Sequence, residues 1–191
     1  AIMDCDDLMA SDRLQVLHDR AERDRLDIVA DNLLLYDRDA RREVGRAFLL
    51  PGESVRLDRQ RLVRNDGPPR VIGLGHLKPF IRRSLISSSR AQYPTDVRLG
   101  EDFCFLFELL GATDRALLID YAGYRYTLPF GLRAGQEGAA SHASHKSDGL
   151  DDLLTQNERL KAANADAPDG RLAALLDARG RRIRDEAHWR A

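Results

Sequence analysis

The sequence predicts an α/β domain, and three observations favour this fold class. An amphipathic helical segment is followed by an apolar stretch that begins at Asp27 and runs towards Tyr36, as a strand would. A second amphipathic segment begins at Glu101, and two short runs rich in Leu, Ile and Tyr come after it. The 191 residues are 43% hydrophobic and carry a formal net charge of −1, which is typical of one globular domain.

Composition and charge exclude several classes of protein. The 30 Lys and Arg residues nearly balance 31 Asp and Glu, whereas a dedicated nucleic-acid-binding protein usually has a basic excess. No apolar run reaches the roughly 18 residues of a membrane span, and no signal segment opens the chain. Cys5 and Cys104 are too few for a disulfide framework and suit a reducing compartment. We therefore expect a cytoplasmic protein that binds no nucleic acid.

The chain opens on an acidic motif that follows a short apolar segment. Ala-Ile-Met leads directly into Asp4, Asp6 and Asp7. Strands that deliver acids at their carboxyl ends normally lie inside a sheet, so we expect an N-terminal part to precede Ala1. Alternating carboxylates after a strand suit Mg²⁺ or Mn²⁺, which often shares its oxygen ligands with substrate phosphates. The alternative interpretation of this motif is a solvated turn.

The next elements are predicted from caps, apolar spacing and helix breakers. Ser11 is suited to cap a helix, and one face of that helix carries recurring apolar residues, namely Leu14, Leu17 and Ala21. Residues 37–69 mix charges with short apolar pieces and specify little structure. Residues 77–83 are expected to be extended, because Pro79 disfavours a continuing helix.

The second acidic motif begins a helix. Glu101 and Asp102 lie in its first turn, where exposed N–H groups and the helix dipole stabilise negative charge, and Gly111 ends it. Alone, such a pair would be a helix-capping feature. Residues 115–121 and 123–127 are predicted to be two short strands.

The last third of the chain is predicted to hold a loop and two helices. Residues 129–148 carry several glycines and two histidines, which is typical of a mobile binding loop. Leucines recur from Leu150 to Leu160 and again from Leu172 onward. The segment 171–191 has six arginines and three acidic residues, and therefore forms a basic amphipathic helix. Packing on the domain is the favoured role, while contact with an anionic membrane surface and homodimerisation remain alternatives.

Taken in order, five motifs resemble family 2 glycosyltransferases of the bacterial exopolysaccharide, succinoglycan-biosynthesis type. The resemblance covers roughly residues 1–130. Each motif alone has little specificity, but their order and spacing together are specific. The motifs lie at residues 3–7, 11–14, 27–31, 78–83 and 99–103.

The resemblance implies a GT-A fold, which is a Rossmann-like mixed sheet flanked by helices. On this interpretation residues 1–147 form a partial glycosyltransferase domain without its N-terminal nucleotide-binding part, and residues 148–191 form a C-terminal helical extension. The implied activity is metal-dependent, inverting transfer of a sugar from a nucleotide-diphosphate donor, with UDP as the expected nucleotide. The acceptor would be a glycan or a lipid-linked acceptor. The second of these would allow a peripheral location of the protein at the inner membrane.

The resemblance also implies roles for the acids. Asp6 matches the aspartate of the DxD motif that binds the metal, and Asp4 matches the acid near the ribose or uracil. Asp7 would support them. Asp102 matches the catalytic base, which Glu101 would help to orient.

Five further residues have weaker assignments. Some members of the family place a loop histidine on the metal, which would be His142 here, although a solvated side chain is the alternative. The basic residues of the 78–83 segment are candidates to meet phosphate or acceptor, but a solvated strand edge is favoured; they are Lys78, Arg82 and Arg83. Cys5 is expected to be a small buried spacer.

Two other functions remain open at this stage. A phosphatase of the haloacid dehalogenase type would use Asp4 and Asp6, but Leu8 stands where that motif needs a hydroxyl. A non-catalytic remnant would fold and self-associate without binding a donor. The Gln-x-x-Arg-Trp signature of processive synthases is absent, which favours a single transfer.

Overall fold

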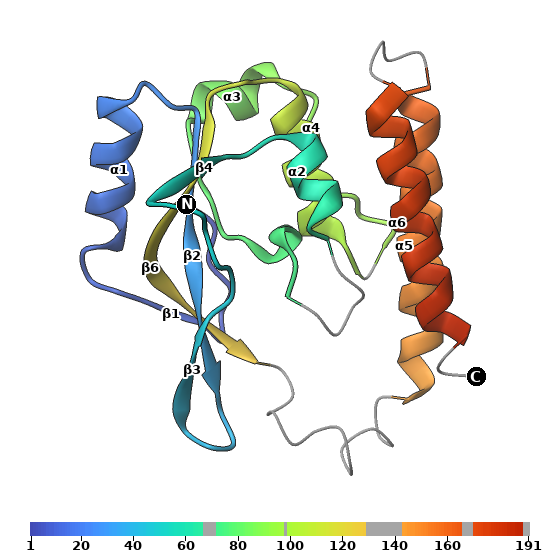
Figure 1. Ribbon diagram of the computed structural model, residues 1–191, viewed down its shortest axis with the longest axis horizontal. Coiled ribbons are helices and arrows are strands. Elements are labelled where there is room, and N and C mark those ends of the chain that lie inside the picture. The colour runs from blue at the N-terminus through green and yellow to red at the C-terminus, as the bar shows by residue number, and fades with distance from the viewer. Residues whose placement is uncertain (67–71, 98, 129–142, 166–169, 189–191) are drawn as a thin grey trace. The chain divides into compact units, whose positions relative to one another are not determined.

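The chain forms two compact units. The computed structural model describes residues 1–66, 72–97, 99–128, 143–165 and 170–188 (Figure 1). Unit 1 comprises residues 1–57, 77–89 and 112–140. Unit 2 comprises residues 58–76, 90–111 and 141–191. The expected division into residues 1–147 and 148–191 stays a prediction.

Unit 1 contains one mixed β-sheet. Within the described residues it has six strands: β1 (Leu8–Met9), β2 (Ile28–Asp37), β3 (Arg42–Arg46), β4 (Ser54–Arg56), β5 (Phe80–Ile81) and β6 (Ala116–Leu128). β2 and β6 run parallel and side by side (Figure 1). β1 and β4 pair antiparallel with β6, and β3 and β5 pair antiparallel with β2. With the helices α1 (Arg13–Arg23) and α3 (Arg83–Ser88), this sheet confirms the predicted α/β fold class.

Helix α1 starts later than its sequence suggests. Its N-cap residue is Asp12, which makes no side-chain capping bond, so the predicted cap at Ser11 is wrong. Leu17 and Ala21 are buried as predicted, but Leu14 is 42% exposed. The inward stripe of the helix runs through residues four apart, and Arg13 therefore takes the place expected for Leu14.

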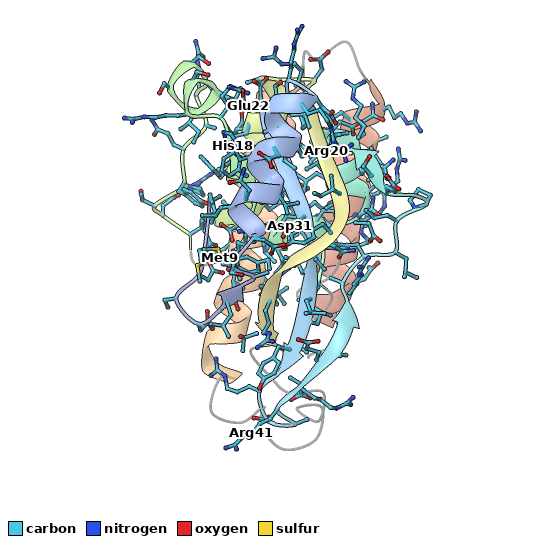
Figure 2. The ribbon with its side chains drawn as sticks, turned by 90° about the vertical axis from the view of Figure 1, so that its left-hand side faces the viewer. Met9, His18, Arg20, Glu22, Asp31 and Arg41 are labelled. Atoms are coloured by element: carbon cyan, nitrogen blue, oxygen red, sulfur yellow. The ribbon has the colours of Figure 1, made fainter. Side chains whose placement is uncertain are left out.

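A buried ion pair connects α1 to the centre of the sheet. Arg13 and Asp31 are 0% and 1% exposed, and Arg13 donates through Nε and Nη2 to the two Asp31 oxygens at 2.9 and 2.7 Å. The same guanidinium donates to the Lys78 carbonyl and lies 4.8 Å from the centre of the Tyr124 ring. The Gly123 N–H also donates to Asp31. Figure 2 shows Asp31 beside α1. Four segments of unit 1 thus meet at this pair.

Strand β6 is continuous where the sequence predicts two strands. Its pairing with β2 shifts register in the middle, where Asn32 alone lies opposite residues 120–123. The predicted strands 115–121 and 123–127 are therefore two halves of one strand that contains a large bulge. A Cβ atom on Gly123 would collide with the Tyr121 ring, which explains the glycine at this position.

Unit 2 is helical among its described residues. Its elements are α2 (Arg59–Arg64), the short 3₁₀ turn η1 (Leu74–His76), α4 (Glu101–Gly111), α5 (Ala143–Ala163) and α6 (Gly170–His188). Three of these helices confirm predictions from apolar spacing. The predicted loop 129–148 is corrected in part, because α5 already begins at Ala143, while residues 129–142 lie outside the described residues. No described helix is both long and apolar enough to cross a membrane.

Two arginines of α6 are used inside unit 2. Arg179 is 2% exposed, donates to Asp66 at 2.6 Å and lies over the Phe103 ring at 4.0 Å. Arg182 donates to the Val63 carbonyl at 2.9 Å. The leucines and the isoleucine of the apolar face are buried or half-buried, which confirms the favoured role of this helix in packing; they are Leu172, Leu175, Leu176 and Ile183. Membrane contact and homodimerisation stay predictions.

The buried pair of unit 1 gives a test of its energetics. We expect Asp31→Asn to lower the free energy of unfolding by about 3–5 kcal/mol, because Arg13 then keeps a buried charge without its counter-charge. Adding Arg13→Met should recover part of this loss. Glu22→Gln breaks the more exposed pair between Glu22 and Arg82 and should cost under about 1 kcal/mol. Urea unfolding measures all three, and a similar loss from Asp31→Asn and Glu22→Gln would contradict the assignment.

Candidate functional site

The first acidic motif forms a turn that is attached to β6. The Asp7 N–H donates to the Asp4 carbonyl at 3.4 Å, which closes the turn. The Asp4 N–H donates to the Tyr124 hydroxyl at 2.9 Å, and the Thr127 hydroxyl donates to the Asp6 carbonyl at 2.8 Å. Three acids are therefore presented together by backbone contacts with one strand.

The residues before this turn differ from their prediction. Residues 1–3, expected to be a strand, are assigned to no strand in the structure. The Ile2 N–H donates to the Pro79 carbonyl at 3.4 Å instead. Cys5 is exposed, so its prediction as a buried spacer is wrong, because the turn directs it outward between two aspartates.

The three aspartates of the turn have different surroundings. The Asp6 side chain is 55% exposed and that of Asp4 is 42% exposed, whereas Asp7 is 5% exposed. Asp7 accepts a hydrogen bond from the Thr127 N–H at 2.7 Å, and its second oxygen is buried without a hydrogen bond in the described part of the chain. Asp7 therefore has a supporting position, while Asp4 and Asp6 are accessible to a ligand.

Lys78 lies beside the turn as a buried cation. Its side chain is 3% exposed, and Nζ lies 2.8 Å from Oδ2 of Asp4. The prediction of a solvated basic strand edge is wrong for this residue, because the segment before Pro79 turns inward where the Lys78 carbonyl meets Arg13. Arg82, at 39% exposed, fits that prediction better and pairs with Glu22.

Among the acids of the turn, Asp6 has the most exposed side chain and is the candidate ligand for a cation. Asp4 is paired with the buried Lys78 and Asp7 with a backbone N–H, whereas Asp6 is paired with an exposed residue, Arg38, at 3.7 Å. No group of three His, Cys, Asp or Glu residues is placed to hold a metal within the part of the chain that the structure describes. One carboxylate combined with substrate phosphates is a common Mg²⁺ arrangement. His142 lies outside the described residues.

Two tyrosines of β6 stay protonated next to the acids. Burial raises the pKa of Tyr126 to about 12, and the carboxylates of Asp7 and Asp4 add to this rise while Lys78 opposes it. Burial also raises the pKa of Tyr124 far above its usual range, with a further contribution from the same acids. At neutral pH both phenols therefore remain uncharged beside the turn.

The second acidic motif lies in unit 2. Glu101 and Asp102 are half-buried in the first turn of α4, as predicted from the sequence. Negative charge is favoured at this end of a helix by the dipole and the exposed N–H groups. The two acidic motifs thus belong to different units.

The start of α4 is held by α5. Gln156, which is 2% exposed, donates to the Leu99 carbonyl, and its Oε1 accepts from the Cys104 thiol at 2.8 Å. Burial raises the pKa of Cys104 to about 11, so this thiol is a hydrogen-bond donor and not a thiolate. Gly100 has φ +83°, and a side chain there would collide with Leu153 and Gln156.

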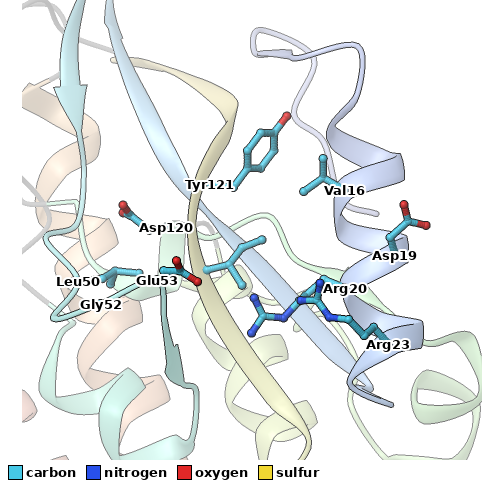
Figure 3. Close-up of a pocket in the computed structure, with 10 residues that line it drawn as sticks. Val16, Asp19, Arg20, Arg23, Leu50, Gly52, Glu53, Asp120 and Tyr121 are labelled. Carbon is cyan, nitrogen blue, oxygen red and sulfur yellow. The ribbon is translucent and has the colours of Figure 1, made fainter.

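A pocket on unit 1 lies apart from these acids. It has a volume of about 760 Å³, and Figure 3 shows Arg20, Arg23 and Tyr121 on the α1 side of β6, with Asp120 on the other side of this strand. None of the predicted site residues lines it. Arg20 pairs with Asp24, and Asp120 is bound by Arg46 and Asn32, so its charged groups are largely satisfied by the protein.

Sequence reasoning missed the residues that hold the acidic turn. Tyr124 and Thr127 lie in the second half of β6, and their only signal was their place in an apolar strand. Nothing in the sequence around Arg13 indicates that Asp31 is its partner.

Comparison with known proteins indicates a distant relationship to an exopolysaccharide-related protein. No family model matches the chain. Over 164 residues the chain is 26% identical to the succinoglycan biosynthesis protein ExoO of Rhizobium meliloti (strain 1021). The aligned part is 83% of this chain and 43% of that protein, so the chain spans less than half the length of this relative.

The structure predicts that the supporting acid Asp7 contributes more to the stability of the protein than the accessible acid Asp6. We expect Asp7→Ala to lower the free energy of unfolding by about 1–3 kcal/mol, because the Thr127 N–H loses its buried acceptor. Asp6→Ala should change it by less than about 0.5 kcal/mol, since this side chain is exposed. Chemical denaturation checks both values. Equal effects of the two substitutions would show that the turn is not anchored through Asp7.

Proposed function

We propose that this chain is part of an inverting family 2 glycosyltransferase that acts in exopolysaccharide synthesis. It would move a sugar from a nucleotide-diphosphate donor, with UDP as the nucleotide, to a glycan or lipid-linked acceptor. The observation that carries the proposal is the similarity to a succinoglycan biosynthesis protein over 164 residues, which is 83% of this chain. The order of the five sequence motifs also supports it.

The acidic turn of unit 1 is the proposed donor site. Asp6 is exposed and would hold a divalent cation together with the diphosphate, while Asp4 would accept a hydrogen bond from the ribose or the uracil. The cation, when bound, supplies positive charge that stabilises the departing nucleoside diphosphate. Asp7 supports this arrangement from inside, because it fixes the turn to the Thr127 N–H.

The first turn of α4 is the proposed acceptor site. Asp102 would take the proton from the acceptor hydroxyl while that oxygen attacks the anomeric carbon. The new C–O bond forms as the bond from the anomeric carbon to the diphosphate breaks, and the bond electrons leave with the nucleoside diphosphate. Attack opposite the leaving group inverts the anomeric configuration. Glu101, one residue away, would orient the base or the acceptor.

Binding of nucleotide tests the donor site. We expect the chain to bind UDP more tightly with Mn²⁺ than without it, and Asp6→Asn to remove this metal dependence because the accessible carboxylate is lost. Asp19→Asn is the matched control, since Asp19 is an exposed aspartate on α1. Isothermal titration calorimetry gives the affinities. Failure of the unaltered chain to bind UDP with metal would favour the non-catalytic remnant.

Transfer activity tests the base. We expect Asp102→Asn to lower kcat by about 10²–10⁴-fold, as for loss of a general base, and to leave UDP affinity nearly unchanged. Asp151→Asn changes an exposed aspartate of the same unit and should leave kcat unaltered. The assay follows UDP release from UDP-glucose and UDP-galactose in the presence of acceptor. Normal turnover by Asp102→Asn would refute the assignment.

A further inference from the structure

Lys78 is buried, whereas the acid with which it pairs is exposed. Its ammonium group is almost fully buried, at 3% exposed, yet its partner Asp4 is 42% exposed. The distance of 2.8 Å between Nζ and Oδ2 of Asp4 is that of a charge-assisted hydrogen bond. A buried cation therefore supports an acid that solvent and ligands can reach.

We propose that Lys78 is a positioning residue. It orients Asp4 for binding the nucleotide, and it offsets the negative charge of the Asp4 carboxylate. The proposal rests on the function proposed above, in which the acidic turn binds a nucleoside diphosphate. Lys78 itself need not touch the ligand, because it lies on the protein side of Asp4.

The pairing determines which Asp4 oxygen meets the ligand. Nζ contacts Oδ2, and the hydrogen bonds and ion pairs among the described residues include none to Oδ1. With one oxygen fixed, the carboxylate plane is fixed as well, and Oδ1 is presented as a hydrogen-bond acceptor. An acceptor at this point selects a donor on the ligand, such as a ribose hydroxyl or the uracil N–H.

The charge of Lys78 also reduces repulsion at the turn. A nucleoside diphosphate is an anion, and it would approach three carboxylates on one short segment. Lys78 pairs with the Asp4 carboxylate from the protein interior, where screening by salt is weak. The negative charge at the turn is thereby reduced by a lysine that is itself buried.

Lys78 is itself held in place before any ligand arrives. Its carbonyl accepts a hydrogen bond from Arg13, whose guanidinium is bound to the buried Asp31. Pro79 follows directly and restricts the backbone of Lys78. The orientation of Asp4 is therefore prepared in advance, which reduces the entropy lost when a ligand binds.

The test is a double-mutant cycle between the two residues. UDP binding with Mg²⁺ is measured by calorimetry for the unaltered chain, for Lys78→Met, for Asp4→Asn and for the double variant. Methionine suits the buried position, because Asp4 is left facing solvent and no buried charge remains unpaired. We expect each single substitution to weaken UDP binding by about tenfold and the double variant to be no weaker than either.

Lys161→Met is the matched control. Lys161 also pairs with carboxylates, Asp177 and Glu158, but on an exposed surface of unit 2, and its loss should leave UDP affinity unchanged. A second measurement does not depend on the folding of any variant. The chain has three lysines, so ¹³C-labelled lysine gives separate signals, and UDP with Mg²⁺ should shift that of Lys78 and leave that of Lys161 in place.

The outcomes separate this proposal from the function on which it rests. If the unaltered chain binds no UDP, the proposed function falls and the role of Lys78 falls with it. If the chain binds UDP but Lys78→Met binds equally well, or the Lys78 signal does not move, only the role of Lys78 is refuted. If the double variant loses UDP affinity by the product of the two single losses, Lys78 acts independently of Asp4, and the proposed role of Lys78 is refuted as well.

Discussion

The buried pair of Arg13 and Asp31 is the interaction on which the arrangement of unit 1 depends. It brings a charged helix residue to the middle of a parallel strand pair, where an unpaired charge would be strongly unfavourable. Arg13 also donates to the carbonyl of Lys78, and Asp31 also accepts a hydrogen bond from the Gly123 N–H in the bulge of β6. Through these contacts the pair connects the interior of the sheet with both supports of the acidic turn. The positions of the exposed acids Asp4 and Asp6 therefore depend on the buried ion pair of Arg13 and Asp31.

Local patterns were sufficient to predict much of the fold. The apolar run of β2, the acids at the start of α4 and the leucine spacing of α5 and α6 each carry their signal within a few neighbouring residues. The two acidic motifs were found for the same reason. Asp4, Asp6 and Asp7 stand out as a cluster, whatever the rest of the chain does.

What the sequence did not predict depends on contacts between distant residues. Arg13 lies in a stripe that periodicity assigns to leucine, because its partner Asp31 comes from another element. Lys78 looks like a residue of a solvated edge until the fold brings Asp4 to it across more than seventy positions. Likewise, the distinct surroundings of three neighbouring aspartates follow from Thr127, which is far away in sequence. Identity and spacing reveal which acids are present, but not which of them is exposed.

The bulge in β6 has a consequence for how the length of this strand can vary. Residues 120–123 of β6 lie opposite the single residue Asn32 of β2, so β6 has three more residues than β2 at this point. Ile119 pairs with Asp31 and Tyr124 pairs with Leu33, so these two residues of β6 lie on the same face of the sheet although they are five positions apart. The bulge therefore absorbs the change in alternation, and the residues after it keep the register with β2 that presents Tyr124 and Thr127 to the acidic turn. Changes in strand length can be taken up inside the bulge, whereas one residue inserted or deleted after it would exchange the two faces of the strand.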